Sequence, residues 1–94
     1  MSGYVIFKVT TANGAIPLGN ALVHVFFEKN NYCKKTFENG FCERFEFPFE
    51  EIKESCVRAT AKILCPGFKD CQLEDLKIYR NVTIVRIVNL TKIQ

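Results

Sequence analysis

The chain has 94 residues, of which 48% are hydrophobic and 24% are charged, and its formal net charge is +3. This length predicts a single domain over residues 1–94, and the composition excludes an intrinsically disordered chain. The basic residues are scattered rather than gathered on one stripe, and no run of about 18 apolar residues occurs. We therefore expect neither nucleic-acid binding nor a membrane span.

Seven short segments alternate between apolar and polar residues with a period of two, which is the pattern of β-strands. The predicted strands are residues 4–10, 21–27, 32–37, 41–47, 56–63, 73–79 and 82–90. Asn, Gly and Pro mark the turns between them, among which are Asn13-Gly14, Asn30-Asn31, Asn39-Gly40 and Arg80-Asn81. Residues 49–55 form the one helix-like piece, after Pro48 ends the preceding strand. Short strands at this spacing predict an all-β Greek-key sandwich of seven strands.

The inward-facing positions of these strands predict one hydrophobic core. Its expected members are Val5, Phe7, Val9, Val23, Val25, Phe45, Phe47, Val57, Ala59 and Leu90. Gly14 and Gly40 each follow an asparagine in a turn, so a positive φ is expected at both.

The last predicted strand does not alternate cleanly, because apolar residues of both parities flank its single charge, Arg86. A strand that is apolar on both faces is either buried on both or pairs with another molecule. A bulge near Arg86 would also explain the pattern, and the sequence does not choose between these interpretations. If the strand pairs with another molecule, the expected partner is a second copy in a homo-oligomer or filament. The candidate edge interface is then Val82, Ile84, Val85 and Ile87.

Five cysteines are an odd number, so at least one thiol has no intrachain partner. Their spacing lacks the close pairs of a zinc site, and we expect neither a metal nor a cofactor. A two-residue hairpin between the third and fourth strands would set Cys33 and Cys42 too far apart for a disulfide, whereas Cys65 and Cys71 flank a turn and could meet. Strand parity predicts outward thiols at Cys33, Cys42 and Cys56. The candidate cross-linking residues are Cys33, Cys42, Cys56, Cys65 and Cys71.

Catalytic chemistry has little support in the sequence. The only histidine, His24, is predicted to face outward from the second strand, with no nucleophile or carboxylate at motif spacing. Because no nucleophile, base and orienting group can be assembled, an enzyme is not expected.

Five stretches occur in an order that is similar to a known family. They are Gly3-x-Val5-x-Phe7-x-Val9-x-Thr11, Ala15 to Val25, Thr36-Phe37-Glu38-Asn39-Gly40, Cys65-Pro66-Gly67-Phe68 and Val88-Asn89-Leu90. Together they resemble the carboxypeptidase-regulatory-like, or transthyretin-like, domains over nearly the whole chain, with Glu38 where that family usually has an aspartate. The resemblance is greatest to the versions in envelope and spore-associated proteins of spore-forming anaerobic bacteria. It implies a prealbumin-like sandwich that acts as a structural module, a spacer, or a protein- or glycan-contacting unit.

A related branch, the collagen-adhesin B-type domains, forms a Lys–Asn isopeptide bond beside a buried acid. Lys8 is the only lysine of the first strand and is predicted to face solvent, and the strand at 56–63 contains no acid. Since the amide needs a desolvated lysine beside a protonated acid, this bond is not expected here.

The expected function follows from these observations. We expect a non-enzymatic structural building block that self-associates through strand edges, with disulfide cross-links, in a cell-surface, spore or fibre-like assembly. The alternative is an accessory module that contacts a glycan or a protein through the loops of the sandwich. The start Met1-Ser2-Gly3-Tyr4 leads directly into a strand without a signal peptide, which predicts synthesis in the cytoplasm and, in a bacterium, the spore or cell surface as destination.

Overall fold

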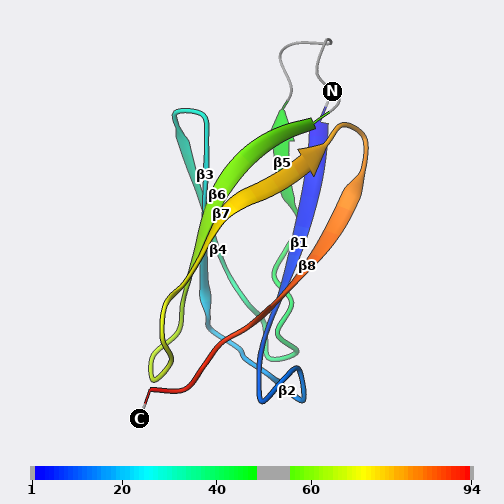
Figure 1. Ribbon diagram of the computed structural model, residues 1–94. Coiled ribbons are helices and arrows are strands. Elements are labelled where there is room, and N and C mark those ends of the chain that lie inside the picture. The colour runs from blue at the N-terminus through cyan, green and yellow to red at the C-terminus, as the bar shows by residue number, and fades with distance from the viewer. Residues whose placement is uncertain (1, 49–55, 94) are drawn as a thin grey trace.

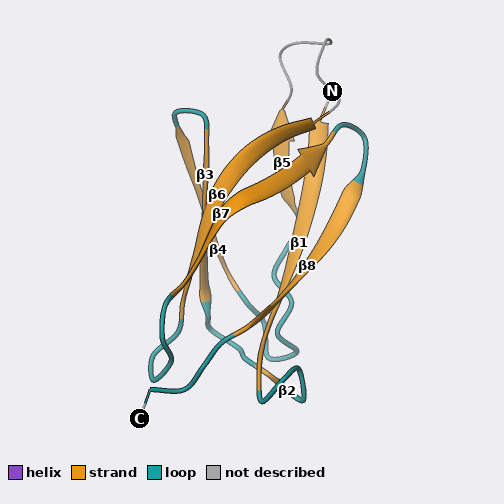
Figure 2. Ribbon diagram, in the orientation of Figure 1, coloured by secondary structure: helices purple, strands orange, loops and turns teal. Residues whose placement is uncertain are grey.

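The structure is a computed structural model that describes residues 2–48 and 56–93 (Figures 1 and 2). Its strands are β1 (Ser2–Thr11), β2 (Ile16–Pro17), β3 (Leu22–Phe27), β4 (Asn30–Lys35), β5 (Phe45–Pro48), β6 (Cys56–Leu64), β7 (Cys71–Tyr79) and β8 (Thr83–Asn89). The all-β prediction is confirmed for the described residues, with the short β2 added to the seven predicted strands. These residues contain no helix that could cross a membrane. The helix-like segment expected at 49–55 lies outside them.

Two four-stranded sheets face each other as a sandwich-like fold. In the first sheet, Tyr4 of β1 pairs with Glu46 of β5 and with Thr83 of β8, so β5 and β8 lie on opposite sides of β1. The short β2 pairs with β1 on the β5 side, at the other end of the strand. The second sheet has the order β4-β3-β6-β7, and its paired strands are antiparallel. Figure 1 shows β1 and β8 running side by side along the length of the molecule.

The inward side chains of both sheets make one core, as the alternation predicts. Nine of the ten expected residues are buried in it, and the tenth, Val57, packs against its margin. Phe47 lies at the centre of a group of rings, with centroids 5.4 Å from Phe27, 4.9 Å from Tyr32 and 5.8 Å from Phe45. Burying a side chain of this size stabilises the fold by about 1.5–3 kcal/mol.

The β3–β4 hairpin turns two residues earlier than predicted. The turn is at Glu28 and Lys29 rather than at Asn30-Asn31, and Glu28 accepts a positive φ of 55°. The observed register pairs Val25 with Tyr32, which brings the Tyr32 ring against Phe47. Packing of the half-buried Tyr32 ring against the core therefore decides the register over the local turn preference of asparagine.

The turn at Asn39-Gly40 carries the chain from one sheet to the other and does not close a hairpin. Phe37 N donates to Phe41 O, and the strand predicted at 41–47 is reduced to β5, preceded by an isolated bridge between Lys8 and Phe41. Strand alternation counted through a two-residue hairpin therefore predicts the wrong face for the residues that follow Gly40. Cys42, predicted to face outward, is 4% exposed and donates its N–H to Phe7 O inside the sandwich.

Candidate functional site

Strand β8 lies at the edge of its sheet, and no described strand pairs with its other side (Figure 1). It runs parallel to β1, and Leu90 N donates to Thr10 O just beyond the strand. In a parallel ladder alternate residues direct both backbone groups to the same neighbour, so the even-numbered residues of β8 bond to β1. The N–H and C=O groups of the odd-numbered residues point away from the sheet. We call the residues of this open side the β8 seam: Thr83, Val85 and Ile87.

The seam also carries exposed apolar side chains on the outer face of the sheet. Val85 is 56% exposed and Ile87 is 63% exposed, and the register sets Val85 beside Ile6 of β1. Of the other two predicted interface residues, Val82 is exposed just before β8, whereas Ile84 faces inward and packs against the core. Apolar side chains and open backbone groups thus coincide at Val85 and Ile87.

The position of Arg86 explains the irregular alternation of this strand without a bulge. The register of β1 and β8 is unbroken from Thr83 to Asn89, which contradicts the bulge considered near Arg86. Arg86 lies on the inner parity, opposite Phe7, but its side chain is exposed. There it lines an open groove of about 360 Å³ together with Tyr79 and Ile84. A long charged side chain tolerates this position because its end reaches water.

The other edges among the described strands carry features that discourage pairing with another chain. β4 carries two lysines, β2 has two residues including Pro17, and β5 has four residues ending at Pro48. The pairing of β7 with β6 has a register shift between Ala59 and Ala61, which is a bulge. Lysines, prolines, short strands and bulges protect natural sheet edges. β8, with seven residues and one charge, has the least protection of these edges.

The five cysteines lie within the described residues, and all are free thiols. Burial raises the pKa of the Cys42 thiol, and burial also raises the pKa of the Cys65 thiol. Both groups therefore stay protonated to a higher pH than an ordinary thiol. Cys65 and Cys71, which the sequence analysis allowed to meet across a turn, do not form a disulfide.

The remaining three cysteines differ in their position relative to the β8 seam. Cys33 is exposed on β4, in the other sheet, and Cys56 is half-buried at the start of β6. Cys71 is half-buried and lines a groove with Asn89 and Leu90, at the end of β8. Of the cysteines expected to face outward, Cys33 is the one that is exposed.

His24 lies on the outer face of β3, as predicted, with its ring stacked on Phe26 at 5.4 Å between centroids. The register places it directly opposite Cys33. This pair was not predicted from the sequence, because the hairpin turn was expected two residues later. No group of three metal-ligating side chains occurs in the described part of the chain. Lys8 also faces outward, with its Nζ 5.1 Å from the centroid of the Phe41 ring.

A second surface feature lies where the chain crosses between the sheets. A groove of about 570 Å³ is lined by Gly19, Asn20, Thr36, Phe37, Glu38 and Asn39. Thr36 is buried beneath it, and its Oγ1 accepts a hydrogen bond from Ala21 N at 3.0 Å and donates one to Leu18 O at 2.6 Å. The Phe37 ring is 53% exposed. The groove thus combines an exposed ring with amide and carboxylate groups, above a threonine that two hydrogen bonds hold in place.

Comparisons with known proteins bear on the fold. No family model and no curated protein matches the chain. Among solved structures, the chain is similar to the Bacillus anthracis TIE protein, with a TM-score of 0.71 and 12% sequence identity over 98% of this chain. The match spans 17% of the length of that chain. At this identity the likeness supports the sandwich-like fold alone.

Proposed function

We propose that this protein is a non-enzymatic building block, a transthyretin-like Greek-key sandwich, which self-associates through the β8 seam in a cell-surface, spore or fibre-like assembly. The observation that carries the proposal is the combination of open backbone groups and exposed apolar side chains at Val85 and Ile87. An apolar strand with a free edge is an aggregation hazard unless it is paired. A second copy supplies a strand with the same properties.

The sequence of β8 favours one register for this pairing. In an antiparallel pair centred on Arg86, the two guanidinium groups would lie directly opposite each other and repel. In a pair centred on Val85, the two Val85 side chains meet and Ile87 lies opposite Thr83 of the second copy. Both registers pair the open backbone groups of odd-numbered residues with one another. We infer the register centred on Val85, which gives a closed two-fold dimer rather than a filament.

This dimer limits where disulfides can contribute. Pairing centred on Val85 sets position 89 of one copy opposite position 81 of the other. The two copies of position 89 are then eight residues apart along the strand, or roughly 27 Å. Cys71, which lies beside the end of β8, is therefore out of disulfide reach of its own counterpart. Covalent cross-links would have to join one dimer to another.

The seam is tested by Val85→Lys combined with Ile87→Lys. We expect the unmodified protein to sediment as a dimer and the variant as a monomer, because two charges per copy would be brought together at the seam. Ile16→Lys combined with Ile93→Lys is the matched control, since these residues are 52% and 54% exposed and lie outside β8. Sedimentation velocity gives the size, and circular dichroism shows that the variants are folded. A variant that sediments like the unmodified protein would refute the proposal.

The groove at Phe37 favours a second candidate function, the binding of a glycan. An exposed ring beside amide and carboxylate groups can stack on a sugar and bond to its hydroxyls. We expect soluble oligosaccharides at millimolar concentration to shift the NMR signals of Phe37, Glu38 and Asn39, and Phe37→Ala to abolish the shifts. Phe26→Ala, on the outer face of β3, is the control and should leave them in place. Signals that do not move for any sugar tested would remove this candidate.

A further inference from the structure

The outer face of the β4-β3-β6-β7 sheet carries a row of polar neighbours that plays no part in the β8 seam. Cys33 of β4 lies opposite His24 of β3, and His24 lies opposite Lys62 of β6. Cys33 is exposed, and the other two are half-buried. A thiol, an imidazole and an ammonium group are thus aligned across three adjacent strands.

The phase of the hairpin decides how closely the backbones of Cys33 and His24 approach each other. Because the turn has two residues, the closing pair Phe27–Asn30 is hydrogen-bonded, and bonded and non-bonded pairs alternate from there. At the other end of the hairpin, Thr36 N donates a hydrogen bond of 2.9 Å to Ala21 O, so this pair is also a hydrogen-bonded one and agrees with the same alternation. His24 and Cys33 therefore form a non-hydrogen-bonded pair. In such pairs the Cα atoms are about 4.5 Å apart and the side chains approach most closely.

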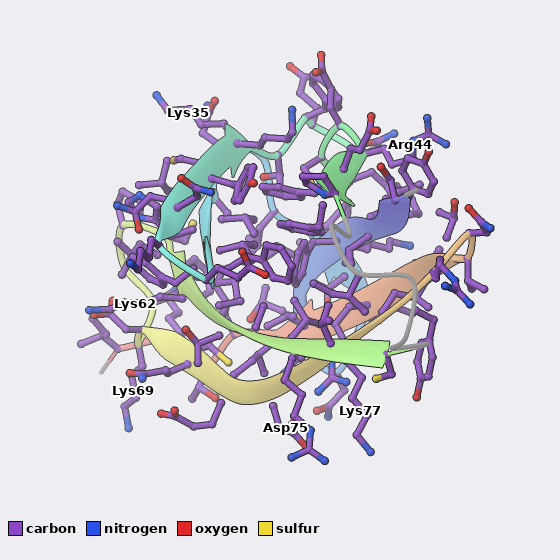
Figure 3. The ribbon with its side chains drawn as sticks, turned by 90° about the horizontal axis from the view of Figure 1, so that it is seen from above. Lys35, Arg44, Lys62, Lys69, Asp75 and Lys77 are labelled. Carbon is purple, nitrogen blue, oxygen red and sulfur yellow. The ribbon has the colours of Figure 1, made fainter. Side chains whose placement is uncertain are left out.

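Two lysines flank this pair. Lys35 lies two positions after Cys33 on the same face of β4, and Lys62 lies beyond His24. The next neighbour of Lys62, on β7, is the neutral Gln72. Figure 3 shows Lys35 and Lys62 at the periphery, pointing away from the side chains packed between the sheets. Cations near a thiol attract anionic reagents to it.

We propose that Cys33 is a thiol–disulfide exchange site for a small anionic disulfide of the glutathione type. His24 takes the proton of the thiol, and the sulfur of Cys33 attacks one sulfur of the disulfide. A new S–S bond forms as the old one breaks, and the departing thiolate takes up a proton. One disulfide is consumed and one is made, so the step needs no other oxidant. Burial raises the pKa of the Cys42 and Cys65 thiols, so a smaller fraction of each is the thiolate that attacks a disulfide.

The site is tested on the whole chain with two disulfides of opposite charge. The protein reacts with oxidised glutathione or with the cationic cystamine at low ionic strength, the reaction is stopped with acid, and mass spectrometry of peptides locates the adduct. We expect Cys33 to be the first cysteine modified. We also expect oxidised glutathione to be favoured over cystamine by roughly tenfold, relative to their rates with free cysteine. Modification of another cysteine first would overturn the proposal, whether or not the β8 seam forms dimers.

Variants separate the roles of the neighbours. His24→Gln should slow the reaction of Cys33 roughly tenfold, because glutamine cannot take the proton. Lys35→Gln combined with Lys62→Gln should remove the preference for the anionic disulfide, whereas Lys69→Gln, outside this row, should keep it. Slow reaction of the buried Cys42 in each variant shows that the fold is intact. An unchanged rate in His24→Gln would refute the role of the imidazole.

Discussion

Gly40→Val is expected to lower the free energy of unfolding by about 3–5 kcal/mol. Gly40 has a φ of +85°, and a Cβ there would lie 2.7 Å from Val9 O and 3.1 Å from Pro17 Cβ. Val9 O cannot easily retreat, because it accepts a hydrogen bond from Leu18 N at 2.9 Å, while Val9 N donates to Gly40 O at 2.8 Å. Left-handed backbone strain costs about 1–3 kcal/mol and overpacking a similar amount.

Gly14→Val is the matched control for this prediction. Gly14 has a similar φ of +91°, but no heavy atom lies within 4 Å of the position of its Cβ. Only the backbone strain remains, so we expect a loss of about 1–2 kcal/mol. Urea denaturation of both variants measures the difference. Equal losses would mean that the close approach of Gly40 to β1 contributes nothing.

Phe47→Ala is expected to lower the free energy of unfolding by about 3–5 kcal/mol, because it removes a buried ring and leaves a cavity. Phe47 is fully buried and contacts three other aromatic rings from β3, β4 and β5, so no single neighbour can move to fill the space. The same truncation at Phe26, which is 41% exposed on the outer face of β3, should cost less than about 1 kcal/mol.

Denaturation midpoints at a constant m-value provide the measurement for the two phenylalanines. Similar losses of unfolding free energy in Phe47→Ala and Phe26→Ala would contradict a core centred on Phe47. A changed m-value in Phe47→Ala would instead report an altered denatured or native state, and the variant Phe47→Leu, which leaves a smaller cavity, would then replace it.

The core was predictable because the period of two is a local property of each strand. Val5, Phe7 and Val9 fall on one face wherever the strand is placed, and the structure buries all three. The face on which Cys42 lies was predicted wrongly, because it depends on a distant contact rather than on a local pattern. Asn39-Gly40 has the sequence of a hairpin turn, but whether the next strand joins the same sheet depends on the distant β1, with which β5 pairs.

The candidate site was predictable only in part. The apolar character of β8, its single charge and the parity that Arg86 shares with Leu90 are visible in the sequence. The groove that Arg86 lines is not visible there, since its other wall is β7, from the second sheet. The pair of His24 and Cys33 depends on the register of the hairpin. That register follows from packing of Tyr32 on Phe47, which neither turn propensity nor strand parity reveals.

The parallel pairing of β1 with β8 has a mechanical consequence. The first and last strands are neighbours, and Figure 1 shows the two ends of the chain at opposite ends of the molecule. Tension applied to those ends pulls β1 and β8 in opposite directions along their common axis. The hydrogen bonds between them, over the seven residue pairs from Tyr4–Thr83 to Thr10–Asn89, are then loaded in shear and share the load, instead of opening one after another. The fold therefore resists tension along its length more strongly than it resists a force that peels one strand away from the sheet.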